Sequence, residues 1–238
     1  MTTINLAATV AEPEYHLPAV DLYRDIHKGI RAELFAVTST AGQADPSDRC
    51  DRAALADHVT SVAAVLESHA EHEDAAIDPV LERHLPDLAS TINSDHERLE
   101  AMFSSITDLA VSVVDAAAGE HRRLMQLLHL DLARFTGSYL EHIDLEERTV
   151  MQRLPQLIGV DEVAAIHGAI ISSIPPDEMA RSLAFMLPAM NIDDRAELLG
   201  GMRMAAPPEA FEATMGLARS VLRPTDFQSL AERMEVAR

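Results

Sequence analysis

Apolar residues recur three or four positions apart along the first two thirds of the chain, which is the spacing of one face of a helix. One stripe lies in residues 18–40 and another in residues 88–117; they contain Val20, Tyr23, Ile30 and Leu34, and Ile92, Leu99, Phe103 and Ile106, respectively. No run of alternating β-branched residues indicates a strand. The pattern therefore predicts an all-α fold.

Turn signals divide this part of the chain into four helices. The segment around Pro46 ends the first, Pro86 the second, Gly119 the third and Pro155 the fourth. The predicted helices cover about residues 18–40, 49–84, 88–117 and 120–154. Long helices with short connections predict an up-down-up-down four-helix bundle over residues 17–155.

The chain on either side of this bundle has a different pattern. Residues 1–16 are expected to form an N-terminal arm. In residues 156–238, recurrent prolines limit the helices to about 10–15 residues each. Asn191 is expected to cap one of them, and Thr225 with Gln228 to form a capping box for the last. We expect a C-terminal appendage of short helices that covers the bundle or forms a homodimer contact.

Composition supports the all-α prediction and excludes some partners. The chain is 47% hydrophobic but only 4% aromatic, a composition typical of helices rich in Ala, Leu, Met and Glu. A formal net charge of -20 repels phosphate backbones, so we expect no nucleic-acid partner. No stretch approaches the roughly 20 apolar residues of a membrane span. The single cysteine, Cys50, allows no internal disulfide and is typical of a reducing cytoplasm.

Polar residues interrupt the predicted apolar stripes at six positions. His27 lies in the first stripe and His96 in the third. The second and fourth helices each contain a His-x-x-x-Glu step, formed by His69 and Glu73 and by His142 and Glu146. A four-residue step places both side chains on one face of a helix. Burying such groups costs several kcal/mol unless a partner satisfies them, and a metal pair in a bundle core is such a partner.

The motif alone is weak, because composition predicts about one His-x-x-x-Glu by chance and the chain also contains His96 to Glu100. The sequence intervals between the four histidines are stronger evidence for a metal site. His27 and His69 are centred on residue 48, and His96 and His142 on Gly119, each inside a predicted turn. His69 and His96 are centred near residues 82–83, just before Pro86. Residues equidistant from a turn lie at equal height in antiparallel helices, so the four histidines are predicted to form one layer.

These residues resemble the hemerythrin-like (HHE cation-binding) domains, over about residues 17–155. The resemblance lies in DIHKGIR around His27, ESHAEHEDAAIDPVL around His69 and Glu73, SDHERLE around His96, and YLEHIDLEERTVM around His142 and Glu146. It implies a non-haem di-iron centre with an oxo or hydroxo bridge. In that centre His27, His69, His96 and His142 bind the irons, and Glu73 and Glu146 bridge them. The C-terminal segment resembles an extension found on some bacterial members.

The sequence departs from the oxygen-carrying hemerythrins at Glu146, where those carriers have a fifth histidine. With two histidines and two bridging oxygens for each iron, each iron could keep an open position. Open positions favour chemistry with O2, peroxide or NO over reversible carriage. Manganese would also suit these ligands, whereas zinc prefers four-coordinate sites with fewer bridging carboxylates.

Other residues are weaker candidates. Tyr23 and Tyr139 precede ligand histidines by four and three residues, so either phenol could donate a proton or hydrogen bond, although core packing also explains both. His72 could be a fifth ligand but is interpreted as a solvated surface residue, and Glu100 could replace a bridging glutamate. Arg31 could pair with a carboxylate behind the ligands or form a surface ion pair.

The leading functional hypothesis is a cytoplasmic di-iron protein that reacts with dioxygen or peroxide as a peroxide-consuming or oxidase-type redox enzyme. A second hypothesis is a non-catalytic module that senses or stores O2, NO or iron, with residues 156–238 transmitting the signal. A third is a di-iron oxygenase acting on an organic substrate, which requires an apolar cavity beside the metals.

Overall fold

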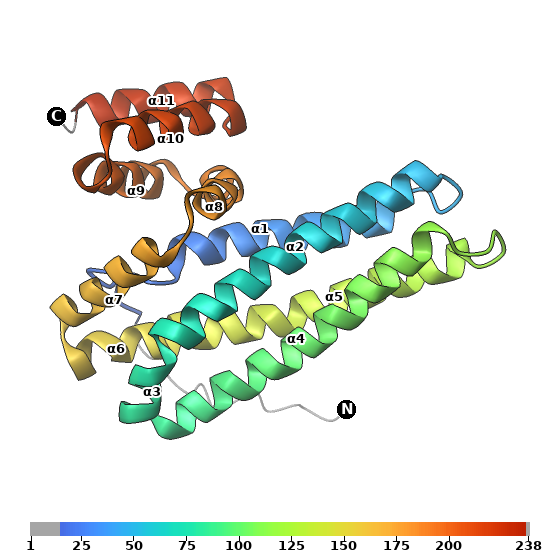
Figure 1. Ribbon diagram of the computed structural model, residues 1–238, viewed down its shortest axis with the longest axis horizontal. Coiled ribbons are helices and arrows are strands. Elements are labelled where there is room, and N and C mark those ends of the chain that lie inside the picture. The colour runs from blue at the N-terminus through green and yellow to red at the C-terminus, as the bar shows by residue number, and fades with distance from the viewer. Residues whose placement is uncertain (1–14, 237–238) are drawn as a thin grey trace, which may run out of the picture.

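The computed structural model describes residues 15–236 and shows an antiparallel four-helix bundle that carries a separate group of short helices (Figure 1). The predicted arm, residues 1–16, therefore lies almost wholly outside the described residues. The long helices of the bundle are α1 (Arg24–Gln43), α2 (Arg49–Ala76), α4 (Pro86–Val114) and α5 (His121–Leu145). Helix α1 packs against α2 and α5, and α4 packs against the same two helices on the opposite side. The predicted all-α, hemerythrin-like bundle is confirmed.

The apolar stripes meet in the middle of the bundle. Ile30 and Leu34 of α1 are fully buried there against Leu99 and Phe103 of α4 and their neighbours. The rings of Phe103 and Phe135 have centroids 4.6 Å apart. A second, smaller core lies toward the α1 start and is formed by Tyr23, Ile77, Ile92, Met151, Val163 and their neighbours.

The first helix starts later than predicted and the second is interrupted. The Asp21 carboxylate accepts the backbone N–H groups of Tyr23 and Arg24 at 3.0 Å, so a side-chain turn precedes α1. The predicted helix 49–84 breaks at Ile77 and continues as α3 (Asp78–His84). Pro79 lies in the first turn of α3, where its missing N–H removes no helical bond.

The predicted end of the fourth helix at Pro155 is wrong. After α5 the chain makes a π-helical turn, η1 (Glu146–Val150), and continues as α6 (Met151–Ile158) with Pro155 inside it. A proline inside a helix removes one backbone hydrogen bond and strains the preceding turn, but here the helix continues past it. The helix ends only before Gly159, whose φ of 86° lies in the left-handed region open to glycine.

Residues 160–236 form the short helices expected from the prolines. They are α7 (Val160–Ser173), α8 (Pro176–Ala189), α9 (Ile192–Ala205), α10 (Pro208–Val221) and α11 (Pro224–Val236). The Asn191 side chain caps α9 by accepting the N–H groups of Asp193 and Asp194, as predicted. The capping box is wrong, because Thr225 lies inside α11 and the Gln228 amide donates to Glu232.

Helix α7 belongs to the bundle rather than to the appendage, since Val163 and Ile166 pack in the second core. The expected domain boundary at residues 155/156 thus falls inside α6, and the architecture changes at α8. We use the word extension for α8–α11. Its core contains Leu183, Leu187, Leu199, Ala218, Leu222, Leu230 and Met234, and α8 packs on α1.

The extension is a tandem repeat of a two-helix unit. Helices α8 and α9 recur as α10 and α11 with starts shifted by 32 residues, since Pro176 corresponds to Pro208 and Ile192 to Pro224. The turns also match, because the backbone angles of Met190 (φ -86°, ψ 153°) and Leu222 (φ -87°, ψ 151°) agree. The Pro-Pro pairs at Pro175 and Pro207 were the available sequence signal for this repeat.

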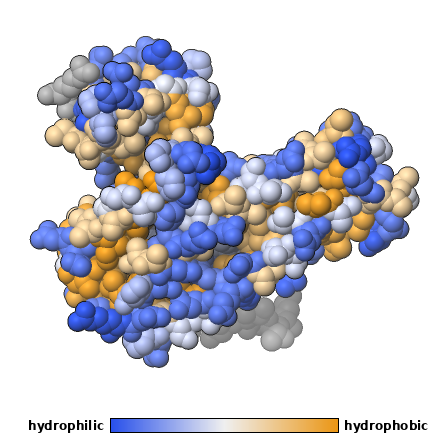
Figure 2. Space-filling model, viewed as in Figure 1, coloured by the Kyte–Doolittle hydropathy of each residue, from blue (hydrophilic) through white to orange (hydrophobic). Residues whose placement is uncertain are grey.

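On the face shown in Figure 2, polar and apolar residues are mixed, and apolar residues gather over α7. No single helix among the described residues is long and apolar enough to cross a membrane. The segments His121–Ile158 and Val160–Ser173, bent by 117°, pass that test only as a pair and only by length and composition.

Candidate metal centre

The bundle brings all six predicted ligand side chains to one layer between its two cores. The first turn of α1 supplies His27, the end of α2 supplies His69 and Glu73, the middle of α4 supplies His96, and the junction of α5 with η1 supplies His142 and Glu146. Their side chains are between 0% and 11% exposed. The predicted layer of histidines is therefore present in the fold.

The six side chains form two halves that share both glutamates. The Nε2 atoms of His27 and His69 lie 3.1 Å apart, and those of His96 and His142 also lie 3.1 Å apart. Two groups of potential metal ligands result, each with two histidines and both glutamates. We call them the His27/His69 half and the His96/His142 half.

Each glutamate presents one oxygen to each half. Glu73 Oε1 lies 3.2 Å from His69 Nε2, and Glu73 Oε2 lies 3.5 Å from His96 Nε2. Glu146 Oε1 lies 3.2 Å from His142 Nε2, and Glu146 Oε2 lies 3.4 Å from His27 Nε2. Each half is therefore ringed by two imidazole nitrogens and two carboxylate oxygens.

The protein itself does not satisfy the buried charge in this ring. Both oxygens of Glu73 and Oε2 of Glu146 are buried without a hydrogen-bond partner within residues 15–236. Burial and the adjacent Glu146 raise the pKa of Glu73 well above its usual value, and burial with His27 lowers the pKa of His69. Against the effect of burial, Glu146 and Glu73 raise the pKa of His96 to about 11, so a metal would displace a proton from that ring. Carboxylate oxygens and imidazole nitrogens that face one point are the ligands that iron and manganese bind. These residues fit a metal pair.

Carboxylates behind the ligands orient two of the imidazoles. The Nδ1 atom of His27 donates to Glu147 Oε1 at 3.0 Å, and Arg31 holds Glu147 through two bonds of 2.7 and 2.9 Å. His96 Nδ1 donates to Asp74 Oδ1 at 2.8 Å. The nearest such group to His142 is Asp95, whose Oδ2 lies 3.9 Å from Nδ1. Metal-binding histidines are usually held by such partners.

Comparison with known proteins agrees with this geometry. Residues 19–154 match the family model of the hemerythrin HHE cation-binding domain. The chain belongs to this family. It is also 21% identical over 208 residues to "Zinc finger protein BRUTUS" of Arabidopsis thaliana, and 22% identical over 206 residues to "Zinc finger protein BRUTUS-like At1g74770" of the same plant.

The two alignments cover 86% and 85% of this hemerythrin-family chain but only 16% of each plant protein. The chain thus spans about one sixth of the length of these curated relatives. Because the alignments are longer than the matched family range, the similarity reaches into the extension. No solved structure matches the chain significantly.

Both candidate tyrosines of the hemerythrin-family site are buried beside ligands. The Tyr23 ring stacks on His27 with centroids 5.1 Å apart, and the Tyr139 ring lies edge-on to His142 at 5.7 Å. Burial, with the nearby charges of Glu73 and Glu146, raises the pKa of both phenols well above 10. Each also packs in one of the two cores. Their catalytic role stays a prediction, whereas their packing role is observed.

Three other candidates have different outcomes. His72 is no fifth ligand, because its Nδ1 donates to the Ser68 carbonyl and its Nε2 lies 3.9 Å from Glu178 of α8. It is not a free surface residue either, since α8 covers it. Glu100 is exposed, so it replaces neither bridging glutamate. Arg31 does pair with a carboxylate behind the ligands, as one of its two interpretations predicted.

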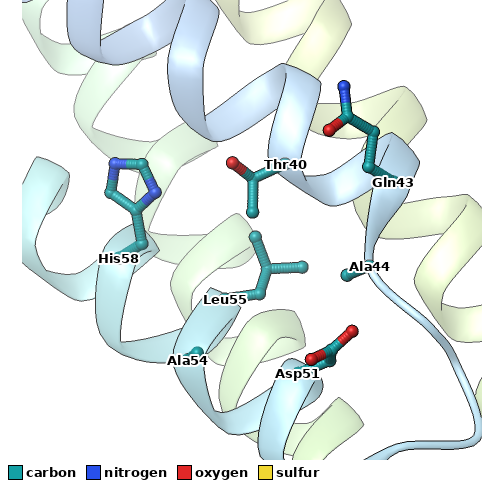
Figure 3. A pocket seen from close by; sticks show the side chains of 7 residues that line it. All are labelled: Thr40, Gln43, Ala44, Asp51, Ala54, Leu55 and His58. Carbon is teal, nitrogen blue, oxygen red and sulfur yellow. The ribbon is translucent and has the colours of Figure 1, made fainter.

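Two cavities of the described chain lie away from the ligands. The first, of about 420 Å³, lies between α1 and α2 near the opposite end of the bundle (Figure 3) and is lined by Thr40, Gln43, Ala44, Asp51, Ala54, Leu55 and His58. The second, of about 590 Å³, lies between the turns of the two repeats of the extension, and Arg195 and Arg223 are among its lining residues. Neither adjoins the metal centre.

Proposed function

We propose that this hemerythrin-family chain holds a pair of iron ions between its six ligands and acts as a peroxide-consuming or oxidase-type redox enzyme. The observation that carries the proposal is the sharing of Glu73 and Glu146, each with one oxygen facing each histidine pair. Each half therefore offers four protein atoms, fewer than the six ligands of an octahedral site. Iron held in this way supplies redox chemistry with O2, peroxide or NO.

The remaining residues of the site would control access and orientation. Tyr23 and Tyr139 close the two sides of the layer toward the two cores, and their rings exclude bulk water from the glutamates. Glu147 and Asp74 fix the Nδ1 proton of His27 and His96, which leaves Nε2 of both rings free for a metal. Manganese fits the same ligands.

A second candidate function is sensing of O2, NO or iron. It is supported by the packing of the extension on α1 next to His27, which joins the site mechanically to a separate unit. The oxygenase hypothesis receives no such support, because the two cavities described above lie elsewhere. Cytoplasmic location and a homodimer through the extension stay predictions.

Metal analysis with absorption spectroscopy tests the proposal. Chain produced in iron-replete cells is expected to contain two irons, and a charge-transfer band that decays on addition of peroxide would support turnover. His69→Ala should lose the metal, whereas His58→Ala should keep it, because His58 pairs with Glu33 away from the site. Two bound irons with reversible O2 binding and no peroxide consumption would exclude the enzyme and favour the sensor. Absence of metal from the wild type would exclude both.

A further inference from the structure

The extension contacts the two helices that carry the His27/His69 half of the metal centre. Helix α8 lies against α1 and meets it at Gly29, two residues after His27. A Cβ atom at Gly29 would lie 2.5 Å from a ring carbon of Phe185. Because Gly29 has no side chain, the Phe185 ring packs directly against the α1 backbone, two residues from the ligand His27.

A second contact holds α8 to α2 beside His69. The Ser68 hydroxyl donates a hydrogen bond to Glu178 near the start of α8. The His72 imidazole, one turn farther along α2, lies 3.9 Å from the same carboxylate. The helix α8 therefore bridges α1 and α2, which carry the two histidines of the His27/His69 half.

Ion pairs strengthen the same attachment. Asp194 at the start of α9 pairs with Lys28, and with Arg24 at 3.6 Å. Arg24 also pairs with Glu197 at 3.2 Å. All these partners on the bundle belong to α1. The extension is thus ion-paired with α1 through Arg24, three residues before His27, and Lys28, directly after it.

The His96/His142 half has a more open surrounding. Asp74, which orients His96, is 55% exposed, whereas Glu147, which orients His27, is 23% exposed and held by Arg31. The His96 side chain is 11% exposed, whereas that of His27 is fully buried. Local opening is easiest where few buried contacts hold the backbone.

We propose that the extension is a fixed cover for the His27/His69 half, with Phe185 and Glu178 as positioning residues that hold α1 against α2. Metal exchange and entry of small ligands then take place through the His96/His142 half. This inference rests on the proposed metal pair, and it assigns a role to α8–α11 within the chain.

Release of iron to a chelator tests the cover. The wild type is expected to release two irons in two phases, a fast one from the His96/His142 half and a slow one from the His27/His69 half. Asp74→Asn should accelerate only the fast phase and Arg31→Met only the slow phase, on the order of tenfold each, which assigns the phases.

Gly29→Ala and Phe185→Ala should then accelerate the slow phase selectively, again on the order of tenfold. Gly29→Ala is informative because alanine favours a helix more than glycine does, so faster iron release in this variant would not come from a weakened helix. Gly137→Ala is the matched control, since Gly137 is an exposed glycine of α5 whose Cβ would contact nothing within 4 Å. Circular dichroism should show unchanged helix content in all three variants.

The outcomes separate the cover from the metal site. Two bound irons with a single release phase, or with both phases equally changed in Gly29→Ala and Phe185→Ala, would overturn the cover and leave the metal site standing. An equal effect of Gly137→Ala would also overturn it. Absence of two metals from the wild type would overturn both the cover and the proposed function.

Discussion

The candidate metal centre of the bundle and the extension both bury charged side chains, but at the metal centre several polar atoms have no hydrogen-bond partner among the described residues. In the extension, Arg195 is 7% exposed and donates to the carbonyl oxygens of Leu187 and Pro188 at 2.7 and 3.2 Å. Asp194 is 8% exposed and pairs with Lys28 and Arg24. At the metal centre, neither oxygen of the buried Glu73 has a hydrogen-bond partner among the described residues.

This difference distinguishes a structural charge from a ligand. A buried ion that the fold itself satisfies stabilises one arrangement of helices, whereas a buried ion without a partner destabilises the fold until something binds it. The bundle core is therefore expected to depend on metal, and the extension is not. Four predictions test this contrast.

Metal removal should have the largest effect. A ligand present at 1,000 times its dissociation constant stabilises the native state by about 4 kcal/mol, so stripping the metals should lower the Tm of the bundle by roughly 10 °C. Differential scanning calorimetry with and without chelator measures this shift. A Tm that does not change would mean that the cluster is not a metal site.

Replacing Glu73 should have opposite effects on the stability of the metal-free fold and on metal binding. In the metal-free chain, burial raises the pKa of Glu73, so Glu73→Gln is expected to stabilise the fold by about 1–3 kcal/mol at high pH, where the wild-type carboxylate is charged, and to have less effect as the pH falls and the carboxyl is protonated. The same substitution should abolish binding of the second metal. Urea unfolding and metal titration provide the two measurements, and Glu100→Gln, at an exposed position in α4, should change neither. Destabilisation of the metal-free chain by Glu73→Gln would contradict the contrast.

Removing a satisfied charge should have the opposite sign. Arg195→Met leaves the carbonyl oxygens at the end of α8 without their donors and should cost about 2 kcal/mol, without affecting the number of bound metals. Hydrogen exchange of the extension measures the loss, and iron analysis gives the control. Loss of metal in this variant would show that the extension and the bundle do not respond separately.

The smallest effect is expected at a cap. Asn191→Ala removes the two hydrogen bonds at the start of α9 and should cost about 1 kcal/mol. Amides of α9 should exchange faster, while those of α2 stay protected. Faster exchange in α2 would contradict independent stability of the two units.

The helices of the bundle were predictable because their apolar stripes are long and regular, but the local breaks were not. Pro79 was available in the sequence, yet whether a proline interrupts a helix depends on the neighbouring backbone. The chain breaks at Ile77 before Pro79 but continues as a helix through Pro155. The 32-residue repeat of the extension was missed because its identities are few and its helix bounds carry most of the similarity.

The ligand layer was predictable from the intervals between histidines and turns, because antiparallel helices convert chain position into height. The carboxylates that orient the ligands were missed. Asp74 and Glu147 each follow a ligand glutamate directly, so the pairs Glu73-Asp74 and Glu146-Glu147 were a usable signal. Each of these carboxylates contacts a histidine on a different helix. Helical spacing within one helix does not predict such a contact.

The sequence by itself determined the all-α class, the four bundle helices and the six residues that meet between them, because periodicity and turn residues act locally along the chain. Only the tertiary structure decided how the glutamates are shared between two halves, that Gly29 leaves room for Phe185, and that α8 contacts the helices carrying His27 and His69. These features depend on contacts between helices far apart in sequence. Packing and burial decide such contacts, and neither produces a regular spacing in the sequence.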